Sequence, residues 1–349
     1  MDETAHKPYS ANWRQRLRRL QESRWTIVAV LVLVLAAVAL AAVNKDISAV
    51  RLLGLVVRGV MLGGILALGA VGLTLVYGVL KMSNFAHGDY MTVGAYIAFV
   101  LVALLPKGTP ILWFSFGYEF LLGLLLAMPL VGLLAYGLDR FTFKRLRARR
   151  SQPIMMAMAA LGIAFGVRSI VYMVFGSDFA FFYSGRARPA VELFLGIRVR
   201  PDQLFILGMA VALIALTYFL LERTKIGKAM RATADNADLA RISGIDTERV
   251  VFWTWLIGGG LAGAGGVMYG LDVQLRPEMG WWLLLPLFAA VILGSIGNVY
   301  GALFGAFTIG IVWQVSSAFI NPSYGPAAAF VVMILVLLIR PEGILGRPR

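Results

Sequence analysis

Ten apolar stretches, most of them close to 20 residues long, constrain this chain more than any other feature of its sequence. An α-helix needs about 20 apolar residues to cross the roughly 30 Å hydrocarbon core of a bilayer, whereas barrel strands alternate over about ten residues. The chain is 60% hydrophobic and 14% charged, against roughly 45–50% and about 25% in soluble domains. The sequence therefore predicts an all-α integral membrane protein, a polytopic bundle of helices.

The predicted transmembrane spans are residues 25–43, 58–80, 89–105, 111–138, 153–176, 203–221, 250–272, 281–297, 302–320 and 326–340. We expect about ten helices, nine to eleven, because 111–138 is long enough to include a turn and 302–320 divides into two shorter pieces. We interpret 25–43 as an uncleaved first span, although its small residues also allow cleavage as a signal peptide. Residues 1–24 then form a basic segment, and 25–349 form one transmembrane domain.

The distribution of Lys and Arg predicts the orientation, since cytoplasmic loops carry an excess of both. With the N-terminus inside, the inside segments hold 22 of these residues and the outside segments eight. Both termini are therefore expected in the cytoplasm. We attribute the net charge of +14 to this orientation and to contacts with anionic lipids, and expect no nucleic-acid partner.

Several chemistries are excluded by what the sequence lacks. It has no cysteine, which excludes disulfides, thiolate metal sites and cysteine nucleophiles. It has no GxxxxGK[ST] loop, so the chain does not hydrolyse ATP by that route. An intramembrane enzyme would need several convergent His, Asp, Glu or Ser side chains, and one region alone comes close. We therefore expect a non-catalytic chain that binds no cofactor and no metal.

That region is "MSNFAHGDYMTVGAY" (82–96), in which Asn84, His87 and Asp89 fall between two apolar spans. A metal site would need more ligands, and a proton relay is a second interpretation. The third, which we favour, is a structural and gating element. In it Gly78 and Gly88 let the chain bend, and Asn84 and Asp89 cap freed backbone groups. Such a break either lines a transport path or is simply a well-satisfied turn.

Arg168, in "GVRSIVYMVFG", is the clearest charge inside a predicted span. A charge there costs roughly 2.5–3.5 kcal/mol on insertion scales and marks a functional site by default. Arg168 either faces a transport path or pairs with a carboxylate, and Asp272 and Glu278 are expected near the same membrane end. The alternative is that it extends towards the interface, as we expect of Arg58.

Two connecting segments have patterns of their own. The outside loop 177–202 includes "VELFLGIRVRP", whose partial alternation predicts a short hairpin. The inside loop 222–249 has six basic and five acidic residues, an Ala- and Leu-containing face, and Gly244, which can end a helix. A short helix of this kind docks into a groove on a soluble partner; the alternative is a solvated connector.

Four segments resemble the membrane subunits of bacterial branched-chain amino acid ABC importers, in particular the short subunit with an NFAHG string. These family segments are "GLTLVYGVLKMSNFAHGDYMTVGAYIAF" (72–99), "GKAMRATADNADLARISGID" (227–246), "AAVILGSIGNVYGALFGA" (289–306) and "RPEGILG" (340–346). Asp238, Leu239 and Ala240 with Gly244 fit the coupling pattern EAA-x-x-x-G, with Asp and Leu in place of Glu and Ala. Two further departures are the added segment 1–49 and Tyr300, where the family often has proline.

The resemblance implies the architecture of the vitamin B12 importer permease and import of branched-chain or related amino acids across the bacterial inner membrane. It also implies two ABC ATPase subunits, a second homologous permease and an extracytoplasmic binding protein as partners. Urea or short-chain amides are alternative cargoes, and an ion-coupled secondary transporter is the alternative mechanism. The expected ATPase-coupling residues are Ala237, Asp238, Leu239, Ala240, Arg241 and Gly244, with Arg231 as a further contact, and the path or gate candidates are Asn84, His87, Gly88, Asp89 and Arg168.

Overall fold

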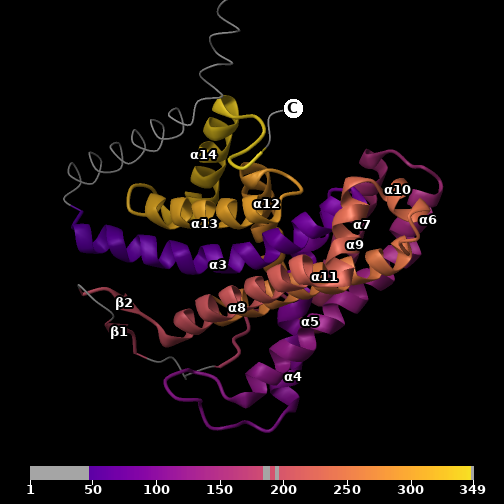
Figure 1. Cartoon of the computed structure of the whole chain (residues 1–349). Coiled ribbons are helices and arrows are strands. Elements are labelled where there is room, and N and C mark those ends of the chain that lie inside the picture. The colour runs from indigo at the N-terminus through magenta and orange to yellow at the C-terminus, as the bar shows by residue number, and fades with distance from the viewer. Residues whose placement is uncertain (1–46, 184–188, 193–195, 347–349) are drawn as a thin grey trace, which may run out of the picture.

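Helices form nearly all the regular structure of the chain (Figure 1). The structure, a computed structural model, describes residues 47–183, 189–192 and 196–346. The basic segment 1–24 and the predicted span 25–43 lie outside the described residues. Within them, every other predicted span corresponds to a helix. These helices are α3 (Ala49–Leu80), α4 (His87–Leu104), α5 (Tyr118–Leu138), α7 (Pro153–Phe175), α8 (Pro201–Arg223), α11 (Thr247–Asp272), α12 (Met279–Gly294), α13 (Val299–Ser316) and α14 (Gly325–Ile339).

Eight helical segments of the described chain are long and apolar enough to cross a membrane. The ninth, α12, is shorter at 16 residues. The predicted span 302–320 is one helix, α13, and not two pieces. The protein is therefore a multi-pass membrane protein, as its apolar runs predict.

Helix α3 lies at the centre of the bundle and is buried along most of its length. It packs along α13 on one side and against α11 on another, and Figure 1 shows α13 lying beside it. Small residues allow this close approach, because a methyl group on Gly59 or Gly63 of α3 would overlap the backbone of α13. The second central helix, α11, also contacts α4 and α5, so the core is built around these two helices.

Helix ends follow local chemistry. Pro153 and Pro201 stand in the first turn of α7 and α8, where proline's missing N–H costs nothing. The side chains of Asp246 and Asn298 cap α11 and α13 by accepting backbone N–H bonds. Gly176, with φ of 75°, ends α7. At their C-terminal ends the predicted spans agree with the observed helices to within four residues, whereas α3 starts nine residues earlier and α5 seven residues later than predicted.

The segment 139–150 is mostly helical, although the sequence predicts only a connection there. Helix α5 continues through a π-helical turn, Asp139–Phe143, into α6 (Lys144–Ala148). Arg147 stabilises this turn, because its guanidinium donates to both oxygens of the buried Asp139 at 2.7 and 2.8 Å. An apolar-run criterion stops at the first charges and misses such an extension.

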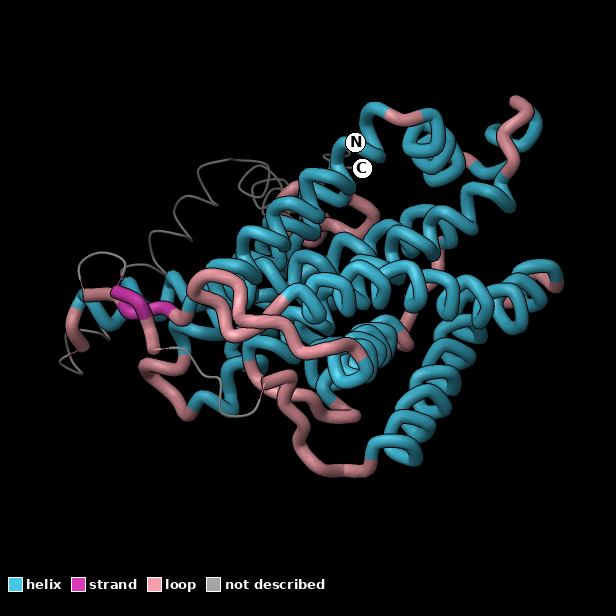
Figure 2. The backbone as a smooth tube through the Cα atoms, turned by 90° about the horizontal axis from the view of Figure 1, so that it is seen from below, coloured by secondary structure: helices cyan, strands magenta, loops and turns pink. Residues whose placement is uncertain are grey.

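The predicted hairpin in 177–202 is confirmed. Strands β1 (Val191–Glu192) and β2 (Arg198–Val199) pair antiparallel, with Val191 opposite Val199. Figure 2 shows this small ribbon at one end of the helical bundle. The second strand is anchored by the buried Val199, which packs with Met61 and Ile197, so the hairpin is attached to α3.

Candidate functional site

The joint between α3 and α4 is buried inside the bundle. Helix α3 ends at Lys81, which adopts a left-handed conformation with φ of 52°. The side-chain oxygen of Asn84 then accepts the N–H of Ala86 at 3.1 Å, and this local bond holds the turn that leads into α4. Asn84, His87 and Asp89 are all fully buried. Asn84 therefore caps the break, as its position predicts.

The imidazole of His87 shows how deep the joint lies. Its Nε2 is 2.9 Å from the carbonyl oxygen of Gly69, a residue 11 positions before the end of α3. At the helical rise this is roughly 16 Å back along α3. The chain after α3 therefore turns back beside it, and the first turn of α4 lies within the bundle. The predicted inside loop 81–88 is wrong in its last two residues, which already belong to α4.

Glycine has a different role at this joint from the one predicted. Gly78 is helical within α3, and the chain bends at Lys81 instead. Gly88 is helical too, and a methyl group there would overlap the carbonyl of Gly280 at the start of α12. The N–H of Gly280 in turn donates to the hydroxyl of Thr92 at 3.0 Å. Gly88 therefore permits helix contact and does not act as a hinge.

Asp89 pairs with Arg168 of α7 and does not cap the helix. The Arg168 guanidinium donates through Nε and Nη2 to the two carboxylate oxygens at 2.9 and 3.0 Å. The Asp89 side chain is completely buried and the Arg168 side chain is 11% exposed. The sequence places these two charges in separate spans, and in the structure they compensate each other. Neither is then an uncompensated charge in the bundle, which would be strongly destabilising.

The guanidinium of Arg168 also lies over two aromatic rings. Its central carbon lies 4.5 Å from the ring centre of Trp281 and 5.5 Å from that of Phe165, both within the range of cation–π attraction. The third guanidinium nitrogen, Nη1, does not donate to Asp89. The pair is therefore fixed in place while one edge of the guanidinium retains donors.

The carboxylates expected near Arg168 have other partners. Glu278, just before α12, accepts the hydroxyl hydrogen of Tyr172 at 2.5 Å. Asp272, at the end of α11, is bound by Arg200 and by Gln203 at 2.9 Å. The interpretation that Arg168 pairs with a carboxylate is thus correct, but the carboxylate lies on α4.

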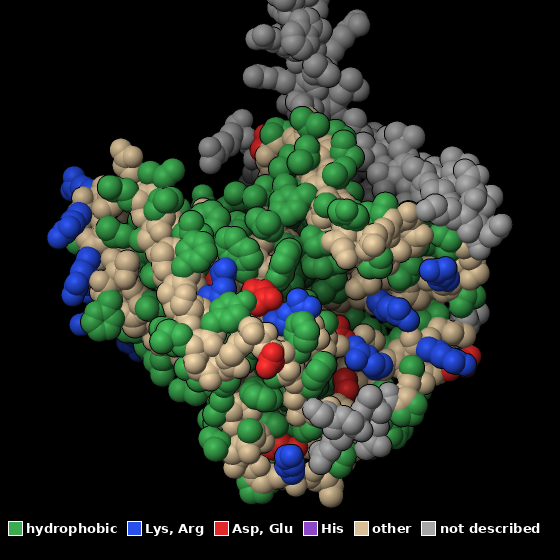
Figure 3. All heavy atoms as spheres, turned by 180° about the vertical axis from the view of Figure 1, so that it is seen from behind, with side chains coloured by type: hydrophobic (Ala, Val, Ile, Leu, Met, Phe, Trp, Pro, Cys, Tyr) green, Lys and Arg blue, Asp and Glu red, His purple; other side chains and the backbone are tan. Residues whose placement is uncertain are grey.

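A line of polar side chains continues from Arg168 along α7 and the start of α12. Tyr172 is one helical turn from Arg168 and holds Glu278, and Arg276 lies 3.9 Å from Glu278. We call Arg168, Tyr172, Arg276 and Glu278 the charged face. Figure 3 shows one face of the molecule on which a few acidic and basic side chains gather among hydrophobic ones. Tyr172 carries no signal in the sequence beyond its spacing of four from Arg168.

The loop 222–249, predicted to lie inside, forms two short helices, α9 (Lys225–Asp235) and α10 (Ala237–Ile242). Asn236 separates them and caps α10, accepting from the N–H groups of Asp238 and Leu239 at 3.1 and 2.9 Å. Gly244 follows with φ of 84°, and Ile245 donates to the carbonyl of Ala240 at 3.0 Å. Gly244 therefore ends the helix as predicted, in a left-handed C-cap.

Most of α10 faces outward. Leu239 is 61% exposed and Ile242 84% exposed. Ala237, Asp238, Arg241 and Gly244 are also exposed, whereas Ala240 packs inward. Arg231 of α9 differs from Arg241, because it forms a close ion pair with Glu222 of α8, at 3.0 Å, whereas Arg241 lies 4.0 Å from Asp238 of its own helix. The coupling candidates other than Ala240 thus form one exposed tip that is apolar at Leu239 and Ile242 and charged at Asp238 and Arg241, with Arg231 set back against α8.

Known proteins are similar in sequence to this chain over most of its length. A family model described as a branched-chain amino acid transport system permease component matches residues 55–339. The permease protein LivH of the high-affinity branched-chain amino acid transport system of Salmonella typhimurium is 32% identical over 299 residues, covering 83% of this chain and 94% of the relative. LivH of Escherichia coli K12 is 32% identical over 300 residues, with the same coverage. BraD of Pseudomonas aeruginosa is 28% identical over 301 residues, covering 84% and 95%.

A search of solved structures aligns PsaBC of Streptococcus pneumoniae, in complex with Fab, with 15% identity and a TM-score of 0.46, covering 87% of this chain and 96% of that one. A likeness of this size establishes no shared architecture. The family assignment rests on sequence, where the matched range includes three of the four family segments and ends just before the fourth, 340–346. The chain belongs to the branched-chain amino acid transport permease family.

Proposed function

We propose that this chain is the membrane-spanning permease subunit of an ATP-driven importer that moves branched-chain or related amino acids across the bacterial inner membrane. Its partners are two ABC ATPase subunits, a second homologous permease and an extracytoplasmic binding protein. The chain itself binds no cofactor and catalyses no reaction. The relatives named for branched-chain amino acid transport support the cargo class.

The exposed tip of α10 carries the proposal. Leu239 and Ile242 present apolar side chains from a polar loop, and burying such side chains in a groove of a partner is favourable. The Gly244 stop and the Asn236 cap fix the length of α10. A helix so delimited can transmit movement of an ATPase to α9 and α11, which flank it. A secondary transporter has no need of such a docking helix.

The charged face is proposed to line the path between the two permease subunits. An amino acid zwitterion carries one carboxylate and one ammonium group, and this face holds the Nη1 edge of the largely buried Arg168 and the carboxylate of Glu278. Urea and short amides are neutral and would gain less from these charges. A proton relay is not favoured, because His87 faces Gly69 and Asp89 faces Arg168, so the two groups meet different partners.

The orientation follows from the same assignment. If α9 and α10 meet ATPases, they lie in the cytoplasm, and both termini lie on that side. The basic residues of 139–150 then face anionic lipid headgroups. We retain 25–349 as one permease domain after the basic segment 1–24, and the vitamin B12 importer architecture as the expected plan.

The double substitution Leu239→Asp with Ile242→Asp tests the coupling role. We expect the permease to reach the membrane at its normal level, because both side chains are exposed, but to lose co-purification with the ATPases and uptake of leucine. Val273→Asp is the matched control, since Val273 is also exposed, at 47%, and lies at the far end of α11. Retained co-purification and uptake in the double variant would refute the proposed docking.

A further inference from the structure

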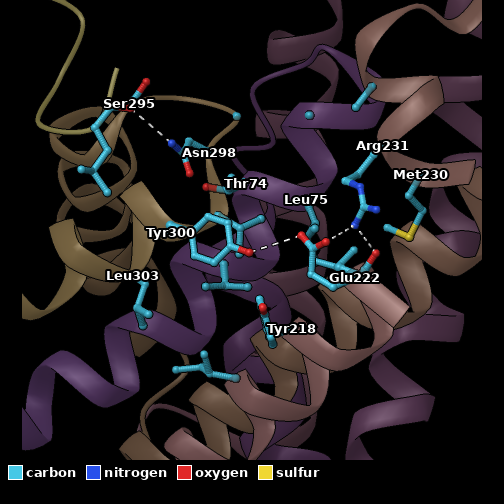
Figure 4. A pocket seen from close by; sticks show the side chains of 18 of the residues that line it. Thr74, Leu75, Tyr218, Glu222, Met230, Arg231, Ser295, Asn298, Tyr300 and Leu303 are labelled. Carbon is cyan, nitrogen blue, oxygen red and sulfur yellow. Dashed lines mark hydrogen bonds and ion pairs between the residues drawn. The ribbon is translucent and has the colours of Figure 1, made fainter. Parts of the chain in front are cut away.

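A large cavity opens between α3, α8, α9 and α13, with a volume of about 780 Å³. Its walls are mostly aliphatic (Figure 4). Each of the four family segments supplies part of the lining. Thr74 and Gly78 come from the first, Arg231 from the second, Tyr300 from the third and Leu345 from the fourth. The cavity is therefore the place where these separate motifs meet, and the proposed path does not account for it.

One part of the cavity wall holds a cation and an anion together. Arg231 lies 3.0 Å from a carboxylate oxygen of Glu222. The hydroxyl of Tyr300 donates to the other oxygen at 3.3 Å (Figure 4). The side chains of Arg231 and Glu222 are 44% and 35% exposed, so both can still meet a ligand that arrives from solvent.

A buried hydroxyl lies beside the same cavity. Thr74 is 1% exposed, and in the described part of the chain its Oγ1 has no hydrogen-bond partner. Asn298 nearby is satisfied, because it accepts from Gly301 at 3.1 Å and donates to Leu345 at 3.3 Å. The oxygen itself has almost no accessible surface, so it lies behind the wall, and Thr74 contributes shape to the cavity and no hydrogen bond.

We propose that this cavity binds an aliphatic α-amino acid, an inference that rests on the proposed function for its cargo class. The ligand carboxylate meets Arg231, its ammonium group meets Glu222, and its side chain lies among aliphatic residues such as Leu75 and Leu303. A simple anion or cation would meet a like charge beside its partner. A hydrocarbon chain would leave the ion pair of Arg231 and Glu222 without new bonds.

Occupancy of the cavity would act on coupling. Arg231 belongs to α9, Glu222 to the end of α8 and Tyr300 to α13. Tyr300 bonds to Glu222. A ligand held by Arg231 and Glu222 therefore connects α9 to the membrane helices α8 and α13 and opposes its movement. Since α9 leads into α10, cargo that has accumulated inside the cell would slow further uptake.

Gly78→Leu tests the site by filling it. Gly78 lines the cavity, and a Cβ added there meets nothing within 4 Å, so a leucine extends into open space without breaking α3. Gly54→Leu is the matched control, because Gly54 lies on the same helix and its Cβ is equally free. Thr74→Val is a second control, because it keeps the shape of the wall and removes a hydroxyl whose oxygen does not reach the cavity.

Binding of radiolabelled leucine is measured on the assembled permease–ATPase complex in nanodiscs, without the binding protein. We expect equal Kd values for the unaltered complex and Gly54→Leu, and a rise of about tenfold or more for Gly78→Leu. Thr74→Val should leave the Kd unchanged, because the Thr74 oxygen does not reach the cavity. Internal leucine should slow uptake into vesicles that carry the unaltered complex and should have little effect on Gly78→Leu.

Leucine binding that is unchanged in Gly78→Leu, or absent from the unaltered complex at millimolar leucine, would overturn the proposal. So would a phospholipid that native mass spectrometry finds on the unaltered complex and not on Gly78→Leu. Failure of the proposed function is distinguishable, because it appears as no leucine uptake by the unaltered complex into leucine-free vesicles, whatever the binding result.

Discussion

Arg168 of α7 holds Asp89 of α4 through two parallel hydrogen bonds, at 2.9 and 3.0 Å, where the carboxylate has no exposed surface. This pair joins the buried α3–α4 joint to α7, most of which is exposed to the surroundings of the bundle. Breaking a buried pair by removing one partner costs more than the pair contributes, because the other charge is left uncompensated. The joint and α7 are therefore expected to respond together to substitution.

Asp89→Asn should destabilise the permease by about 3–5 kcal/mol, because it leaves Arg168 unpaired. Arg168→Lys should be nearly as harmful, since an ammonium cannot reproduce the bidentate geometry. The measurement is the thermal unfolding midpoint in detergent. Arg241→Gln is the control, because its ion pair with Asp238 is exposed and 4.0 Å long and should contribute little.

The combination Asp89→Asn with Arg168→Gln separates pairing from general disruption. Removing both charges should restore part of the lost stability, since neither partner is then left charged in the bundle. A double variant as unstable as the sum of the single variants would show that the two side chains act independently, against the pairing.

Gly88→Ala should prevent proper packing of α4 against α12. The added methyl group overlaps the carbonyl of Gly280, and such overpacking costs typically about 1–3 kcal/mol. We expect a lower yield of folded protein, measured by fluorescence-detected size exclusion. Gly162→Ala on α7 should behave as the unaltered chain, because a Cβ there meets open space. Equal yields for the two variants would contradict the close contact.

Asn84→Ala and His87→Ala should lower the amount of folded permease and leave transport per molecule unchanged. Both side chains are fully buried and bond to the backbone, Asn84 to Ala86 within the turn and His87 to Gly69 of α3. The measurement is leucine uptake divided by membrane abundance. A normal abundance with reduced uptake would instead place these side chains in contact with the cargo.

The spans were predictable because lipid demands long apolar runs and because local caps end them. For example, the span predicted at 326–340 corresponds to α14 (Gly325–Ile339), and the span predicted at 153–176 corresponds to α7 (Pro153–Phe175). Helix α3 extends back beyond its predicted start, to Ala49, because Arg51 and Arg58 lower the local hydropathy without preventing a helix. The nature of each span is thus readable from composition, whereas charged helix ends are not.

The candidate site was only partly predictable. Asn84, His87, Asp89 and Arg168 stand out because polar groups inside apolar runs are rare, but the sequence order does not say that α4 lies beside α7. The pairing of Asp89 with Arg168 had one available signal, that each is an unbalanced charge of opposite sign within a span. The cavity had none, since its lining comes from four segments that meet only in three dimensions.

Glu278→Gln should slow transport without uncoupling the ATPases. If Glu278 on the charged face receives the cargo ammonium group, loss of a bond to a charged group is worth about 1.5–3 kcal/mol, which lowers the uptake rate about tenfold or more. The rate is measured at saturating, leucine-loaded binding protein. Glu248→Gln, on an exposed pair with Lys144, is the control, and equal rates would remove Glu278 from the path.

Gly244 should tolerate substitution only by residues that accept a left-handed backbone. Its φ is 84°, and a Cβ there meets nothing within 4 Å, so any effect arises from the backbone and not from a clash. An L-residue in this region costs roughly 1–2 kcal/mol, and asparagine is among the few that visit it routinely. Gly244→Val should therefore weaken co-purification of the ATPases strongly, and Gly244→Asn only slightly.

Gly137→Val serves as the control, because Gly137 is helical and its Cβ is equally free. If Gly244→Asn and Gly244→Val lose the ATPases to the same extent, the left-handed cap is not what positions α10.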